Sequence, residues 1–341
     1  MRWDSVHLAG LGTWLPEPTP IEKAIEAGEC GREWTDSFGY LSVLIADETA
    51  PPDMAVHAAA SALKRSGVAP EDFSLLLHGS IWFQGLDIWP AASYIAQRTV
   101  GGSVPAIDVQ QRCNVGVSAL ELAAAHITAG RTDDAVMITT ADRFAAPAAD
   151  RWRLRHGNAY ADGGTAMVLS GRGGFARLLA TATAADNTLE GRARGKEPFT
   201  TVSRALTEPI DLKARAEQDD MDDLEVSGRI ARMMLTVRNR LLADAGIDQS
   251  QIAYAVFPSV GKSDGEMQLH DLFCLTEEQT TWEFARRVGH IGPGDQCAGL
   301  AHLLTGGMLS PGDKVVLWGG GAGYTLSAAV VEIDELPDWA A

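Results

Sequence analysis

The chain repeats one structural unit, and this repeat constrains the fold more than any other feature of the sequence. Residues 62–80 and 241–259 each read as the end of a helix, a glycine stop, a polar turn and an apolar strand. At the same spacing, residues 134–139 align with residues 313–318, and each run places a turn aspartate before an apolar strand. Two matching units at one spacing predict a chain built from two similar halves.

Helices and strands alternate in both copies, which predicts βα units and sheets covered by helices on both faces. The expected strands include residues 75–77, 136–138 and 315–317, and the expected helices are 54–66, 115–129, 229–245 and 297–308. The repeat then predicts an α/β fold with halves at 1–182 and 225–341. The segment 183–224 between them is charged and irregular, and it is interpreted either as a lid or as a solvated linker.

Charge and composition exclude several classes of partner. Lys and Arg total 28 against 45 Asp and Glu, so the formal net charge is −17. Such a chain repels nucleic acid and anionic lipid surfaces, and we expect neither as a partner. No apolar run reaches the ~18 residues of a membrane span, and the first residues do not resemble a signal peptide. The four cysteines show neither CxxC pairs nor metal-ligand spacing, so we expect a cytoplasmic protein without a metal.

Cys113 lies at a strand–turn–helix junction within residues 106–126. The positive end of a helix dipole favours the thiolate at such a position, and a similar elbow exposes nucleophiles in other α/β enzymes. Cys113 is therefore a candidate nucleophile. A small buried core residue is the alternative interpretation.

The repeat aligns residues 292–295 with the Cys113 turn, so the two elbows are expected to face each other between the halves. His290 and Asp295 lie in or beside this second elbow, where either could act as a general base or orient one. Two alternatives stay open: Asp295 as the N-cap of the helix that follows, and His290 as a loop histidine without a task. The glycine run at 319–323 leads into a strand rather than a helix, which argues against a nucleotide site and favours close approach of the backbone to a ligand.

Taken in order, these motifs resemble the thiolase-fold ketoacyl synthase III group. Within this group, the chain resembles the branch of acyltransferases of polyketide and other natural-product pathways, antibiotic biosynthesis included. The matching segments are 53–72, 90–97, the elbow with Cys113, 162–167 and 312–323. The resemblance implies a pseudo-duplicated αβαβα layered fold, a homodimer, and Cys113 as the acylated residue. It also implies an acyl donor carried on coenzyme A or an acyl carrier protein, with no other cofactor.

Two departures from the family bear on the reaction. Condensing members carry a His where this chain has Ser259 and an Asn where it has Pro293. In the family these groups hold the thioester oxygen and stabilise the enolate, and each such donor is commonly worth ~3 kcal/mol. The resemblance therefore implies acyl transfer without decarboxylative condensation, with Ser259 in the emptied histidine position.

The expected mechanism passes the acyl group from Cys113 to a hydroxyl, an amine or a carrier thiol, with Asp295 or His290 acting on the acceptor. Backbone N–H groups of Cys113 and of Gly320 and Gly321 are expected to form the oxyanion hole. Two alternatives remain: a condensing enzyme of the synthase III type, and a non-catalytic partner subunit of a heteromeric synthase. Three further residues, Arg151, Arg153 and Arg155, are interpreted either as contacts for a carrier protein or phosphopantetheine, or as an exposed loop.

Overall fold

The computed structural model describes residues 1–130, 134–201, 203, 208–262 and 269–340. In these residues one nine-stranded sheet runs in the order β5-β4-β6-β7-β1-β8-β11-β10-β9, beside a small sheet of two strands, β2 and β3. The strands are β1 (His7–Trp14), β2 (Pro18–Pro20), β3 (Ser42–Leu44), β4 (Phe73–Gly79), β5 (Ala106–Val109), β6 (Ala135–Asp142), β7 (Gly163–Ser170), β8 (Ala176–Ala185), β9 (Ile252–Val256), β10 (Lys314–Gly321) and β11 (Thr325–Ile333). The helices are α1 (Ile21–Glu26), α2 (Glu33–Asp36), α3 (Pro51–Ser66), α4 (Ala91–Arg98), α5 (Val115–Ala129), α6 (Gly191–Arg194), α7 (Leu212–Glu217), α8 (Asp223–Ala245), α9 (Trp282–Val288) and α10 (Asp295–Thr305). None of the helices within the described ranges is long and apolar enough to cross a membrane.

The nine-stranded sheet is two sheets joined by a short seam. β1 pairs with β7 along most of its length but meets β8 only at His7 and Leu8. β8 instead pairs with β11 from end to end, so it belongs to the sheet of the second half. The expected boundary at residue 182 therefore falls inside a strand, because β8 continues to Ala185.

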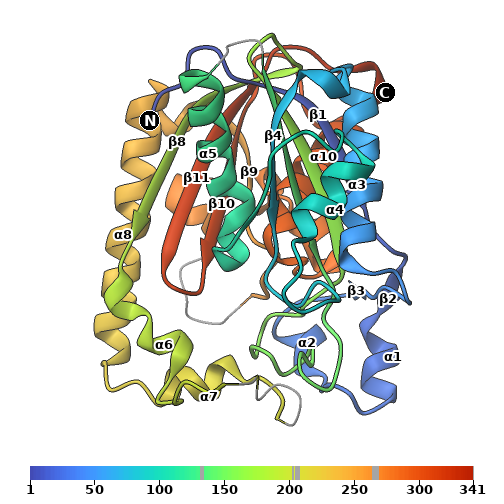
Figure 1. Cartoon of the computed structure of the whole chain (residues 1–341). Helices are drawn as coiled ribbons and strands as arrows, with labels where there is room; N and C mark the ends of the chain where they lie inside the picture. The colour runs from blue at the N-terminus through green and yellow to red at the C-terminus, as the bar shows by residue number, and fades with distance from the viewer. Residues whose placement is uncertain (131–133, 202, 204–207, 263–268, 341) are drawn as a thin grey trace.

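Helices cover both faces of each half, as the alternating pattern predicts. α5 and α10 lie between the two halves and contribute buried residues such as Leu120 and Leu300 to one shared core. α3 and α4 cover the outer face of the first half, and α8 covers the outer face of the second. Figure 1 shows α3 and α8 on opposite sides of the molecule with the strands between them. The arrangement is a five-layered αβαβα fold.

The repeat read from the sequence is confirmed. α3 and α8 both end at a glycine in the left-handed conformation, Gly67 with φ 64° and Gly246 with φ 68°, and only glycine adopts this conformation without steric cost. α8 begins earlier than the expected residue 229. The carboxylate of Asp222 accepts the N–H groups of Leu224 and Glu225 and so caps the helix there.

The two elbows meet between the halves without a side chain to separate them. The first is a single 3₁₀ turn, Arg112–Asn114, and the second is its counterpart, Gly292–Gly294. A Cβ atom added to Gly116 would lie 2.0 Å from the carbonyl oxygen of Pro293. The absence of this atom lets the start of α5 lie directly against the second elbow.

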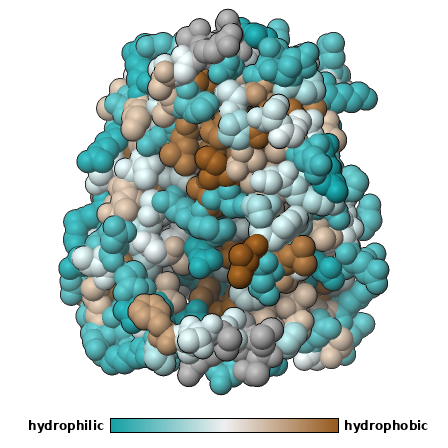
Figure 2. Space-filling view, viewed as in Figure 1, coloured by the Kyte–Doolittle hydropathy of each residue, from teal (hydrophilic) through white to brown (hydrophobic). Residues whose placement is uncertain are grey.

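Apolar side chains are exposed near the open edge of the sheet. β5 is the last strand at this end of the sheet in the described residues. Its Ile107 is 51% exposed, and Leu122 of α5 is 49% exposed. Figure 2, drawn from the same side as Figure 1, shows hydrophobic side chains gathered over α5.

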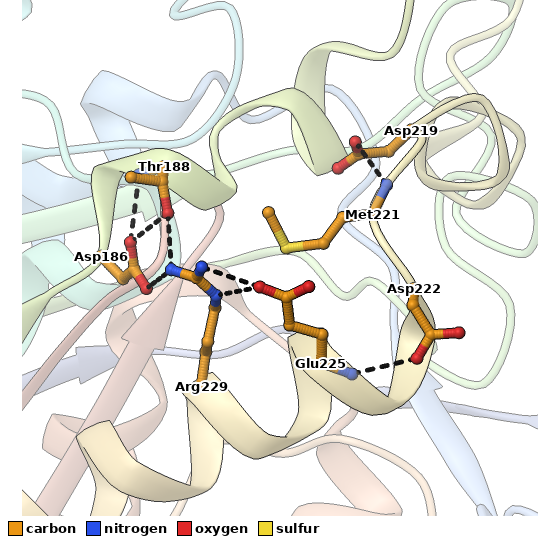
Figure 3. Close-up of polar contacts among 7 residues, drawn as sticks. All are labelled: Asp186, Thr188, Asp219, Met221, Asp222, Glu225 and Arg229. Atoms are coloured by element: carbon orange, nitrogen blue, oxygen red, sulfur yellow. Dashed lines mark hydrogen bonds and ion pairs between the residues drawn. The ribbon is translucent and has the colours of Figure 1, made fainter.

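The charged segment between the halves is tied to α8 by a polar cluster around Arg229 (Figure 3). The Arg229 guanidinium donates to Asp186 at 3.2 Å, to Thr188 at 3.1 Å and to Glu225 at 2.8 Å. Met221 also packs against α8 beside the buried Leu189. Both ends of the segment therefore contact the second half, whereas residues 202 and 204–207 lie outside the described part of the chain.

The elbow contact predicts a stability difference between two helical glycines. Gly116→Ala would force a Cβ atom against the Pro293 carbonyl, and we expect the free energy of unfolding to fall by about 1–3 kcal/mol. Gly228→Ala in α8 is the matched control, because its Cβ would meet only Arg232 at an ordinary 3.6 Å. The control is expected to be neutral or slightly stabilising. Denaturant unfolding of both variants measures this difference, and equal stabilities would contradict the elbow contact.

Candidate active site

Cys113 lies half-buried in the first elbow, between β5 and α5. The residue before it, Arg112, has φ 52°, a left-handed conformation that costs a non-glycine residue about 1–2 kcal/mol. The Arg112 side chain donates to the carbonyl of Ile81 at 2.9 Å, which fixes this turn to the end of β4. The chain thus bends sharply directly before the cysteine.

His290 is buried between the halves and held through its backbone. Its N–H donates to the carbonyl of Ala159 at 2.7 Å, and its own carbonyl accepts the N–H of Ala161 at 2.9 Å. The ring of Tyr160 packs edge-on against the imidazole, with centroids 5.2 Å apart. These contacts fix the imidazole in one place, which the interpretation as a loop histidine without a task does not explain.

The structure brings Cys113, His290 and Asp295 into one hydrogen-bonded row. His290 Nε2 lies 3.1 Å from Cys113 Sγ, and His290 Nδ1 lies 2.6 Å from Asp295 Oδ2. A nucleophile, an imidazole and a carboxylate in this order form the geometry of covalent acyl-transfer catalysis. The imidazole orients toward the thiol because the carboxylate holds its far nitrogen.

Asp295 is not the N-cap of α10. The helix begins at Asp295 itself, and the capping position is Gly294. The Asp295 carboxylate is fully buried and accepts the N–H groups of Ile291 at 2.9 Å and Ser259 at 2.7 Å, in addition to His290. It is therefore enclosed behind the imidazole, and its hydrogen bonds lead to Cys113 through His290.

The electrostatics of the row favour a charged imidazole. Burial by itself would lower the pKa of His290, but the Asp295 carboxylate and Cys113 together raise this pKa well above 6.5. A protonated imidazole beside Cys113 stabilises the thiolate, which is the nucleophilic form of cysteine.

The glycine end of β10 lies against the first elbow. A Cβ on Gly321 would be 2.5 Å from the carbonyl of Gln111, and one on Gly319 would be 2.8 Å from the side chain of Asn114. The same atom on Gly320 would instead meet Leu326 of β11, on the other face of the strand. The structure therefore brings Gly321 to the elbow, while a substituent on Gly320 would point away from it.

Ser259 lies behind Asp295 and contacts it through the backbone. Its N–H donates to the carboxylate, and its carbonyl accepts the hydroxyl of Tyr40 at 2.9 Å. The neighbouring Pro258 and Val260 line a cavity of about 680 Å³. Ser259 therefore lies between two residues of the cavity lining and contacts the Asp295 carboxylate through its N–H.

The cavity is lined by apolar and cationic side chains together. Phe257 and Trp282 contribute apolar surface, Arg155 and Lys262 contribute positive charge, and Glu277 contributes a negative charge. Lys262 pairs with Glu277 and lies 5.3 Å above the ring of Trp282. Such a cavity suits a ligand with an apolar arm and an anionic group.

Arg151 is not available to a partner, although the sequence suggested a contact for it. It forms a buried ion pair with Asp162 at 3.1 Å and donates to the carbonyl of Phe144 at 2.6 Å. Arg153 is exposed and pairs with Asp150 at 3.6 Å. Of the three arginines, Arg155 is the one that lines the cavity.

A further buried carboxyl, not among the predicted site residues, lies near the site. Asp142 at the end of β6 accepts the N–H groups of Ile81 and Trp82, and a Cβ on Gly292 would lie 3.1 Å from its Oδ2. Burial raises the pKa of Asp142 to about 8, although His290 and these N–H groups oppose the shift. An aspartate at the end of an apolar strand was the available signal. No cluster of His, Cys, Asp and Glu that could hold a metal ion occurs among the residues described.

Comparisons with known proteins agree with this geometry. Residues 242–333 match the family model of the 3-oxoacyl-[acyl-carrier-protein] synthase III C-terminal domain, and residues 38–190 match that of the thiolase N-terminal domain. The solved structure of the acyltransferase ChlB3 is 35% identical and has a TM-score of 0.92, covering 98% of this chain and 100% of that one.

More distant relatives carry the same fold. The β-ketoacyl-[acyl-carrier-protein] synthase III of Desulfotalea psychrophila is 23% identical over 96% of this chain and 99% of its own length. The synthase III structure from Pseudomonas aeruginosa PAO1 has a TM-score of 0.75 at 22% identity, over 98% of this chain and 99% of that one. The αβαβα architecture is thus the thiolase fold. The chain belongs to the ketoacyl synthase III-like family of thiolase-fold proteins, whose members are enzymes.

The raised pKa of His290 predicts how stability depends on pH. Because the folded-state pKa lies above the ordinary 6.5, the stabilisation by Asp295 is complete below about pH 6.5 and is lost as the pH rises through the raised pKa. The gap in unfolding free energy between wild type and Asp295→Asn should therefore be larger at about pH 6 than at about pH 9. Urea unfolding at both pH values measures the gap, and a gap independent of pH would show that His290 is neutral in the folded protein.

Proposed function

We propose that the protein is an acyltransferase of secondary-metabolite biosynthesis, such as a polyketide or antibiotic pathway. It takes an acyl group from a coenzyme A or acyl-carrier-protein thioester onto Cys113 and transfers it to a small-molecule hydroxyl or amine, or to a carrier thiol. The observation that carries this proposal is the hydrogen-bonded row of Cys113, His290 and Asp295. The proposed reaction needs no cofactor besides the donor thioester.

In the first half-reaction, the Cys113 thiolate attacks the thioester carbonyl and the donor thiol leaves with a proton from His290. In the second, neutral His290 accepts the proton of the acceptor group as that group attacks the acyl-enzyme, and Cys113 leaves as the thiolate. Asp295 keeps Nδ1 of the imidazole occupied and stabilises its charged form. We assign the oxyanion hole to backbone N–H groups of Cys113 and of the Gly320–Gly321 end of β10.

Two observations favour transfer over condensation. Ser259 and Pro293 stand where condensing members of the family carry His and Asn, and the imidazole of this site comes from the second elbow instead. The relative at 35% identity bears the name of an acyltransferase, whereas the synthases III are more distant, at 22–23% identity.

The cavity behind Ser259 supports a phosphopantetheine-bearing donor. Its apolar walls suit a pantetheine arm, and Arg155 offers positive charge to a phosphate, whereas Lys262 is already paired with Glu277. We therefore propose that coenzyme A or a carrier protein delivers the acyl group from this side.

A second copy of this chain is the partner we propose for the β5 edge. The terminal strand offers backbone groups and the exposed Ile107, and α5 offers the exposed Leu122 as further apolar area. Two copies related by a two-fold axis could pair through such an edge, and the homodimer suggested by the family resemblance would form there.

Intact mass spectrometry after exposure to acyl thioesters tests the covalent step. One acyl adduct is expected on the wild type and on Cys274→Ala, which removes an exposed thiol, and none on Cys113→Ala. Addition of a competent acceptor should then discharge the adduct. An equal adduct on Cys113→Ala would overturn the assignment, and no adduct from any donor would favour the non-catalytic subunit.

Release of carbon dioxide from malonyl thioesters tests the absence of condensation. Acyl-primed enzyme is expected to release none above the uncatalysed background, because Ser259 and Pro293 do not provide the donors that stabilise an enolate. The adduct on Cys113 serves as the control that priming has occurred. Turnover of about 1 per second or faster, in the usual range of enzymes, would instead establish the condensing alternative.

A further inference from the structure

A chain of hydrogen bonds fastens the first elbow to the second half at the residue next to the nucleophile. Asn114 is fully buried. Its Nδ2 donates to Gln111 Oε1 at 2.8 Å and to Ser327 Oγ at 2.9 Å, and its Oδ1 accepts the N–H of Ser327 at 3.1 Å. Both the nitrogen and the oxygen of the Asn114 amide are therefore hydrogen-bonded, and the two bonds to Ser327 reach β11.

The chain continues from β11 to β8 and back to α5. Ser327 Oγ lies 2.9 Å from Thr183 Oγ1, and Thr183 lies 3.4 Å from a carboxylate oxygen of Glu121. The direction of the bonds is fixed, because the amide nitrogen of Asn114 can only donate and an ionised Glu121 can only accept. Each hydroxyl between them accepts one bond and donates the next.

Asn114 is closely packed against the glycine end of β10. A Cβ on Gly319 would lie 2.8 Å from Asn114 Oδ1, and a Cβ on Gly321 would lie 3.2 Å from the backbone nitrogen of Asn114. The side chain therefore fills the space beside the glycine end of β10. A change at Asn114 has to move the elbow, the β10 end or both.

We propose that Asn114 is a positioning residue that holds Cys113 in register with His290 and with the N–H groups at the glycine end of β10. The inference rests on the proposed role of Cys113 as the nucleophile. The amide is needed because it donates to Ser327 and also accepts from it, which neither a carboxylate nor an apolar side chain does. Since consecutive Cα atoms are 3.8 Å apart, a shift of Asn114 passes directly to Cys113, and a misplacement of about 1 Å costs roughly 100-fold in rate.

The rate and pH profile of Cys113 alkylation by iodoacetamide, read by peptide mass spectrometry, test the proposal. Asn114→Ala is expected to slow alkylation roughly 10- to 100-fold and to move its pH profile toward alkaline pH, because the imidazolium no longer lies beside the sulfur. Thr183→Val breaks the same chain of hydrogen bonds farther from the elbow. It should slow alkylation and move the pH profile in the same direction as Asn114→Ala, by a smaller factor. A purely structural role would lower the melting temperature without moving the pH profile.

Thr181→Val is the matched control. Thr181 lies two positions from Thr183 on β8, and its hydroxyl accepts the indole N–H of Trp3 at 3.0 Å, outside the chain to Asn114. In Thr181→Val, the rate and pH profile of Cys113 alkylation should equal those of the wild type. If Asn114→Ala does not fold, the proposal is tested by comparing Cys113 alkylation in Thr183→Val with that in Thr181→Val.

The proposal would be overturned if Asn114→Ala kept the alkylation rate and pH profile of the wild type. If Asn114→Ala is unfolded, the same result in Thr183→Val would overturn it. Alkylation needs no acyl donor, so this result is independent of the proposed function. A protein that accepts no acyl group but still shows the alkylation difference would contradict the acyltransferase function and support the role of Asn114.

Discussion

The approach of the two elbows is the constraint on which the site depends. The carbonyl of Pro293 occupies the place that a side chain on Gly116 would take, and this contact brings Cys113 of one half to 3.1 Å from His290 of the other. β1 pairs with β8 at two positions, and the chain before β1 adds backbone hydrogen bonds to β8. The shared core between α5 and α10 and the hydrogen bonds of Asn114 also join the halves.

The sequence predicted those parts of the fold and the site that depend on local patterns. The repeated helix–turn–strand unit predicted the two halves, and the alignment of the elbows predicted that Cys113 would meet the segment with His290 and Asp295. The role of Asp295 could not be predicted, because its carboxylate binds the N–H of Ser259, a residue far away in the chain. The same applies to Arg151: its sequence neighbourhood suggested an exposed loop, whereas its partner Asp162 comes from the start of β7 and buries it.

Three buried carboxyls surround the site, and each is compensated differently. Asp162 pairs with an arginine and two backbone N–H groups, and Asp295 pairs with His290 and two backbone N–H groups. Asp142 accepts backbone N–H groups and has no ion pair within the described part of the chain. Burial of an ionised carboxylate is costly without such partners. The group with the weakest compensation is Asp142, and it is the one whose pKa rises to about 8. Of the three carboxyls, Asp295 is the one that contacts the imidazole beside the sulfur.

The placement of the Cys113 thiol and the His290 imidazole on different halves has a consequence for the newly made chain. Cys113 leaves the ribosome long before His290 and Asp295, and until the second half has docked its thiol has no imidazolium beside it. An incomplete or half-folded molecule therefore holds the Cys113 thiol without the imidazole beside it. The duplicated architecture completes the hydrogen-bonded row only when both halves have folded, so that the row and the enclosure around it arise in the same event.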